Sequence, residues 1–201
     1  MARLPRRAAK TRVPLYSRAA LGFDGAMINF RLALSSLAAL FAGACDNVVI
    51  YYTDQALPYS THFIAANIRD GQLPLRIHGD PIPGVEPEDF AAALSVPPWI
   101  SPPIKLTTNP TDNTRDLAVV MVFNPAFKDS GRDIACRAGA KPPTEAGDGK
   151  TLRIAANICH EGTSISTLDA AGPAPESLDD PKFQRLFSDV MASLMPKISL
   201  R

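Results

Sequence analysis

The residues with which this chain could carry out catalysis or hold a metal ion are few and widely spaced. Its histidines are His62, His78 and His160, and none of them forms the HxH, HxxxH or HExxH spacing that brings two ligands to one zinc ion. Ser164 follows Gly162-Thr163, but the segment lacks the second glycine of the GxSxG nucleophile elbow. We therefore predict no metal site, no cofactor and no catalytic residue from local motifs.

One group of residues leaves an enzyme as the alternative interpretation. His160 and Glu161 are adjacent, and with Asp54 they could form a hydrolase site for cell wall or peptide if the fold brought them together. Cys159 cannot form a dyad with His160, because neighbouring side chains of a strand point to opposite faces. A weaker option, carriage of a metal or small ligand, requires the histidines to converge in space.

The charge distribution argues against a nucleic-acid partner. Residues 1–44 carry seven basic side chains and one acidic one, a net charge of +6, whereas residues 45–201 carry 14 basic and 19 acidic side chains, a net charge of −5. A nucleic-acid-binding protein concentrates its basic residues on the folded part, which is the acidic part here. Of the 19 prolines, 17 follow residue 44, and this density argues against a helical bundle.

An apolar segment near the N-terminus has the features of a secretion signal. From Met27 onward Arg31 is the only charge, and apolar or small residues then continue to Ala44. Residues 32–44 would span about 20 Å as a helix, which is short of the ~30 Å hydrocarbon core of a membrane. We predict that residues 27–44 are a signal peptide, and that residues 1–26 are an unfolded extension that a start misassigned ahead of Met27 would explain.

The end of this segment, Leu40-Phe41-Ala42-Gly43-Ala44-Cys45, resembles the lipobox of bacterial membrane lipoproteins. In that family signal peptidase II cleaves before the cysteine, whose thiol receives a diacylglycerol with acyl chains such as palmitate. Ala42 stands where leucine is more usual. The resemblance implies lipidation of Cys45 and a place in the bacterial cell envelope, anchored to the membrane and facing the periplasm. An uncleaved signal anchor or plain secretion is the alternative.

Lipidation of Cys45 would leave Cys136 and Cys159 as one pair among the three cysteines. An oxidising envelope compartment would allow these two to form a disulfide. The bond would close a loop of 24 residues and stabilise the fold by roughly 3.4 kcal/mol in the chain-entropy model. We expect a structural bond, because no CxxC spacing favours zinc and no local motif activates a thiol.

The pentapeptide Ile-Ala-Ala-Asn-Ile occurs twice, at residues 64–68 and 154–158. A run of β-branched and aromatic residues precedes each copy, at Val48–Tyr52 and at Val119–Phe123, and such runs are the strongest local strand signal. These flanks favour an internal repeat over a chance identity, with central strands about 90 residues apart. Both copies are accordingly predicted to be strands.

The two units continue alike beyond the pentapeptide. Asp70-Gly71 and Glu161-Gly162 are hairpin signals, and third strands are predicted at residues 73–78 and 164–168. Each unit is then predicted to end in a helix. An acidic residue followed by a proline marks the start of each helix, at Glu86-Pro87 and at Asp180-Pro181. The second helix carries an apolar stripe at helical spacing, made of Phe183, Leu186, Phe187, Val190, Met191 and Leu194.

We therefore predict an α+β fold made of two β-β-β-α repeats, residues 46–96 and 116–201, in one mature domain of residues 45–201. The strands form an antiparallel or mixed sheet, and the helices pack on one face of it. A Pro-rich connector, residues 97–115, joins the repeats and contains Trp99. This side chain is a possible partner-binding anchor, and its alternative role is to cover the seam between the repeats.

The function predicted from these features is that of a non-catalytic binding or assembly module. Its lipid anchor would hold it on the membrane, and it would present a sheet edge, the Trp99 segment or the insertion at residues 125–150 to another envelope protein. The hydrolase near His160 and Glu161 is the alternative. Convergence of these residues in one pocket, with loss of turnover in His160→Ala, would favour the enzyme.

Overall fold

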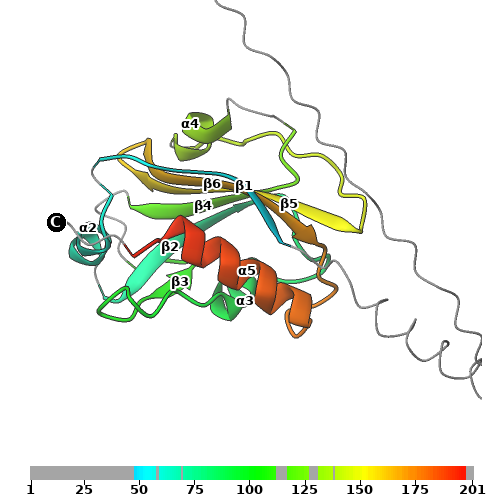
Figure 1. Cartoon of the computed structure of the whole chain (residues 1–201), viewed down its shortest axis with the longest axis horizontal. Helices are drawn as coiled ribbons and strands as arrows, with labels where there is room; N and C mark the ends of the chain where they lie inside the picture. The colour runs from blue at the N-terminus through cyan, green and yellow to red at the C-terminus, as the bar shows by residue number, and fades with distance from the viewer. Residues whose placement is uncertain are drawn as a thin grey trace, which may run out of the picture. The chain divides into compact units, whose positions relative to one another are not determined.

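The computed structural model describes residues 48–57, 59–68, 70–111, 117–126, 131–137 and 139–197, and these belong to one compact unit. Cys45 and the predicted signal peptide lie outside the described residues. Figure 1 shows the arrangement of the strands and helices. In chain order the elements are β1 (Val49–Gln55), α2 (Thr61–Asn67), β2 (Gln72–His78), α3 (Pro87–Ala93), β3 (Lys105–Thr107), β4 (Ala118–Phe123), α4 (Gly131–Cys136), β5 (Thr151–His160), β6 (Thr163–Pro173) and α5 (Pro181–Leu194).

The strands form one mixed sheet in the order β1-β6-β5-β4-β2-β3. The pairs β1/β6, β6/β5 and β5/β4 are antiparallel, whereas β2 is parallel to both of its neighbours, β4 and β3. All six residues of β4 are buried, as expected for a strand with an uninterrupted apolar sequence that is covered on both faces. The predicted α+β class with a mixed sheet is confirmed.

Helices α3 and α5 pack on the same face of the sheet (Figure 1). Helix α5 begins as predicted, because the Asp180 side chain accepts a hydrogen bond from the Lys182 amide and Pro181 occupies the first turn. The whole predicted apolar stripe is buried. Phe90 of α3 joins this core, with its ring centroid 5.7 Å from that of Phe183 and 5.1 Å from that of Phe187.

The opposite face carries α4, a helix that the sequence did not predict (Figure 1). A second, smaller apolar cluster lies there, formed by Val120, Val122, Ala135, Cys136, Ala155 and Cys159. The predicted helices therefore share one face, but the fold has a covering element on both. Throughout the described ranges no helix is both long and apolar enough to cross a membrane.

The predicted repeat is not confirmed, because the two identical pentapeptides adopt different structures. Residues 154–158 lie within β5 as expected, whereas most of residues 64–68 belong to α2. The Ser60 hydroxyl accepts a hydrogen bond from the Phe63 amide and so caps this helix. The first unit is therefore β-α-β-α, and three other strands lie between its strands β1 and β2 in the sheet.

The two predicted hairpin turns have the same backbone geometry but different settings. Glu161 and Gly162 have φ values of 51° and 77°, and they join β5 to β6 as a two-residue hairpin. Asp70 and Gly71 have φ values of 54° and 65°, but they connect α2 to β2. The Pro-rich connector also contains a strand, β3, which pairs with residues 72–74 of β2.

Candidate functional site

Most of the exposed large apolar side chains among the described residues lie on β1. This strand forms one edge of the sheet, and four consecutive large side chains on it are open to solvent: Val49, Ile50, Tyr51 and Tyr52, which are 44%, 36%, 67% and 38% exposed. Here we call these four residues the β1 edge surface. Exposed apolar residues that gather on a strand at the edge of a sheet are typical of an interaction site, because a further strand on the open edge would satisfy the backbone and bury the side chains.

The position of β1 explains why its apolar side chains are not covered. Opposite Val49 and Ile50 on β6 stand Ala171 and Ala170, whose small side chains shield little of their neighbours. Val48, just before the strand, still packs against the main core. From Val49 to Asp54 every residue of β1 is exposed.

A β-bulge interrupts the pairing of β1 with β6. The register shifts between Ile50 and Tyr52, so that Tyr51 is the extra residue. A bulge re-aims the side chain it carries and limits uncontrolled pairing at a sheet edge. The side chain re-aimed here is also the most exposed of the four. Val49–Tyr52 carries no lysine, charge or proline of the kind that protects other edges.

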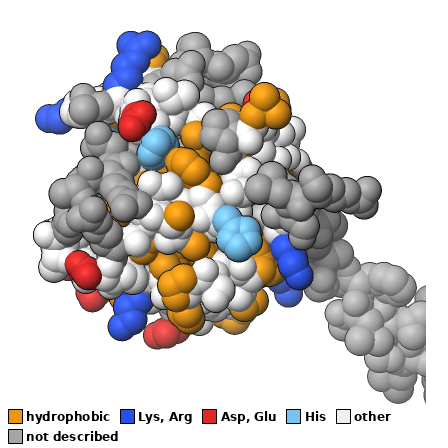
Figure 2. Space-filling model, turned by 90° about the vertical axis from the view of Figure 1, so that its left-hand side faces the viewer, with side chains coloured by type: hydrophobic (Ala, Val, Ile, Leu, Met, Phe, Trp, Pro, Cys, Tyr) orange, Lys and Arg blue, Asp and Glu red, His pale blue; other side chains and the backbone are white. Residues whose placement is uncertain are grey.

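The histidines do not converge. His62 is exposed on α2, His78 ends β2, and His160 ends β5 at the other end of the sheet. The His160 ring meets Phe63 edge to face, with centroids 4.9 Å apart, so that it packs against α2. Figure 2 shows the molecule from the side on which α2 lies in Figure 1, where two histidine side chains are separated by apolar ones. No cluster of three potential metal ligands occurs among the residues that the structure describes.

The residues of the hydrolase alternative lie on different faces of the sheet. Asp54 is paired with Thr167, which is paired in turn with Asn157, and these cross-strand neighbours face the α4 side. His160 instead contacts Phe63, whose side chain packs on the main core. The geometry therefore brings no carboxylate of Asp54 to the His160 imidazole, and Glu161 is an exposed turn residue.

Trp99 has a structural contact that accounts for its position. Its indole Nε1 donates a hydrogen bond of 2.6 Å to the main-chain oxygen of Met195, and its ring packs against the main core. Tyr59 acts similarly, because its hydroxyl donates to the Pro196 oxygen at 3.1 Å and burial raises the pKa of the phenol. Both side chains therefore hold the chain that leaves α5 against the core, while partner binding by Trp99 stays a prediction.

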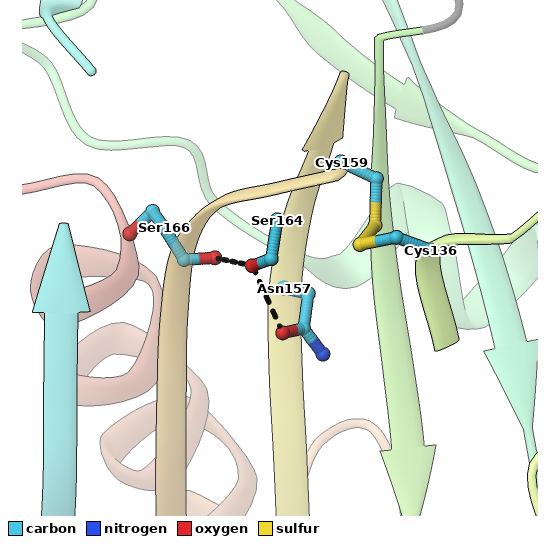
Figure 3. The surroundings of a disulfide bond; sticks show 5 residues. All are labelled: Cys136, Asn157, Cys159, Ser164 and Ser166. Carbon is cyan, nitrogen blue, oxygen red and sulfur yellow. Dashed lines mark hydrogen bonds between the residues drawn. A yellow bond between two sulfur atoms is a disulfide. The ribbon is translucent and has the colours of Figure 1, made fainter. Parts of the chain in front are cut away.

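The predicted disulfide is confirmed. Cys136 and Cys159 are bonded, with Cα atoms 5.3 Å apart, and the bond attaches α4 to β5 (Figure 3). Beside it the Ser164 hydroxyl lies 3.2 Å from Asn157 Oδ1 and 3.1 Å from the Ser166 oxygen. Asn157 Nδ2 and Thr167 Oγ1 are buried here without a hydrogen-bond partner in the described structure. The bond therefore holds a short helix over a polar part of the sheet.

Comparisons with known proteins identify no relative. No family model matches the chain, and neither the curated proteins nor the solved structures contain a significant match. Functional inference for this chain therefore depends on its residues and their geometry. The sequence predicted a strand at Val48–Tyr52, but only the sheet order reveals that this strand is an open edge.

Proposed function

We propose that this protein is a non-catalytic binding module of the bacterial cell envelope that pairs its β1 strand with a strand of another envelope protein. The observation that carries the proposal is the β1 edge surface, in which exposed apolar side chains coincide with a sheet edge that has no further strand beside it among the described residues. Strand addition uses both, because backbone hydrogen bonds supply affinity and alternate side chains supply specificity.

Two features support the proposed location. The lipobox-like residues before Cys45 favour lipidation and anchoring on the periplasmic side of a membrane. The disulfide between Cys136 and Cys159 is typical of proteins that fold in an oxidising compartment. Val49 lies four positions after Cys45 along the chain, a reach of at most about 14 Å. A lipid on Cys45 would therefore hold the β1 edge surface close to the membrane, where an envelope partner would meet it.

Photocrosslinking in native membranes tests the binding surface. A photoreactive benzoylphenylalanine in place of Tyr51 should give a discrete adduct with one envelope protein. The matched control carries the same group in place of Gln184, which is exposed on the outer side of α5, and should give no such adduct. Equal adducts at both positions, no adduct at Tyr51, or an adduct only with a second copy of this chain would contradict the proposed partner.

The anchor is tested separately. Globomycin should cause an uncleaved precursor to accumulate, and the mass of the mature chain should include the added lipid. Cys45→Ser should release the protein from the membrane fraction. A chain that lacks the lipid mass and is found in the cytosol with Cys136 and Cys159 reduced would contradict the location, whatever the crosslinking shows.

A further inference from the structure

A cavity of about 500 Å³ lies beside β2, toward the edge of the sheet that is opposite to β1. The last four residues of the strand, Leu75–His78, line its wall, together with Gly79 directly after the strand. Successive side chains of a strand point to opposite faces, so a cavity that touches all four strand residues lies along the edge of the strand. Pro87 and Thr108 border it on one side, and residues after α4 border it on the other.

This edge of β2 has no partner strand among the described residues. β4 occupies the opposite edge, where it pairs with Leu75–His78. On the cavity side β3 pairs with Gln72, Leu73 and Pro74 and then ends. The last four residues of β2 therefore offer backbone groups to the cavity that a further strand could bind.

The ionisable side chains that line the cavity among the described residues are all basic. Arg76, His78 and Arg137 line it, and none of the described lining residues is acidic. Burial and the neighbouring Arg76 lower the pKa of His78, as expected where cationic groups gather without a counter-charge. The nearby Glu88 carboxylate is engaged elsewhere, because it accepts hydrogen bonds from Thr107 and from Thr108.

We propose that this cavity binds the carboxyl-terminal end of an extended peptide. The peptide backbone pairs with the free edge of β2, and its terminal carboxylate accepts charge-assisted hydrogen bonds from the guanidinium groups of Arg76 and Arg137. Apolar lining from Leu75, Ile77 and Ala135 accommodates small apolar side chains. The site is independent of the proposed lipid anchor and of the β1 edge surface, so neither of those has to be correct.

Fluorescence anisotropy with the full chain in detergent micelles tests the site. The probe is a dye-labelled five-residue peptide of alternating valine and threonine with a free carboxyl terminus. Its matched control is the same peptide with a carboxamide end, which should bind at least tenfold more weakly because it lacks the anion. N-acetylvaline supplies the carboxylate without a strand, and should compete poorly. Equal binding of the amide, or full competition by N-acetylvaline at similar concentration, would overturn the proposal.

Protein variants and backbone changes locate the binding. Arg76→Gln and Arg137→Gln should each weaken the free-acid peptide about tenfold, with little effect on the amide. Arg153→Gln is the control, because Arg153 is an arginine of β5 that does not line the cavity. Its guanidinium forms an exposed ion pair with Glu145 at 2.7 Å. N-methylation of the peptide should abolish binding at alternate positions only, as strand pairing requires. Uniform effects along the peptide, or an Arg153→Gln loss equal to the others, would refute strand addition to β2.

Discussion

Removal of the disulfide should destabilise the protein by about 3 kcal/mol and should first release α4. The double substitution Cys136→Ala and Cys159→Ala opens a loop of 24 residues, whose closure is worth roughly 3.4 kcal/mol in the unfolded state. Helix α4 has six residues, and a helix of that length is not stable by itself in water. Among its described side chains, Ala135 and Cys136 are the buried apolar ones, and they belong to the small cluster around Val120 and Val122. The bond therefore supplies much of its attachment.

Two measurements follow the two parts of this expectation. Guanidinium denaturation monitored by circular dichroism should give a free energy of unfolding lower by about 3 kcal/mol. Trypsin under native conditions should cleave the variant faster at Arg137, an exposed residue directly after α4. Reduction of the natural protein should reproduce both effects, whereas the reductant should not change the variant. A loss below about 1 kcal/mol, with unchanged cleavage at Arg137, would refute the reasoning.

Three further substitutions test the packing and the electrostatics. Gly172→Ala should lower thermal stability by about 1–3 kcal/mol, because its Cβ would stand 2.8 Å from Cδ1 of the buried Leu186; an unchanged melting temperature would contradict this. Thr167→Val should raise the free energy of unfolding by about 1 kcal/mol in urea, since the buried hydroxyl has no partner in the described structure; a loss would mean that it is bonded in solution. Hydrogen bonds from Thr108 lower the pKa of Glu88. The stability that this carboxylate contributes to the fold is therefore fully present above its ordinary pKa, and it is lost as the pH falls through the lowered pKa. Glu88→Gln should therefore flatten the acid side of a plot of melting temperature against pH, and an unchanged slope would contradict the assignment.

The parts of the fold that local chemistry determines were predictable. Asp180 and Pro181 mark the start of α5, and the spacing of its apolar residues marks the buried face. Glu161-Gly162 similarly specifies a hairpin, because both residues adopt positive φ there. In each case the residues that decide the structure lie within a few positions of one another.

The failed repeat shows where local reasoning stops. Residues 64–68 and 154–158 have one sequence, but the first copy is preceded by a capping Ser60 and packs Ile64 into the core from a helix. The second copy lies between β4 and β6, where extended backbone completes both ladders. Tertiary partners override the propensity of five residues. Ser60 was the local signal that could have identified the helix.

The two open edges could not be predicted, because exposure of a strand depends on which strands lie beside it. Val48–Tyr52 is continuously apolar, a pattern that usually indicates a strand covered on both faces, yet β1 is an edge. Similarly, β2 was predicted within a residue of its observed bounds, but β3 ends early and leaves one edge of Leu75–His78 without a partner strand among the described residues. Both facts arise from contacts between residues far apart in the chain.

The sheet order also decides how the two proposed sites relate. β1 lies at one edge, and β6, β5 and β4 separate it from β2, a distance of about 19 Å at the usual strand spacing. A strand added to β1 and a peptide seated beside β2 would therefore not compete for the same backbone groups or side chains. Because both proposed sites belong to one continuous sheet, the two proposals together predict that the protein holds a partner strand on β1 and a chain terminus on β2 at the same time.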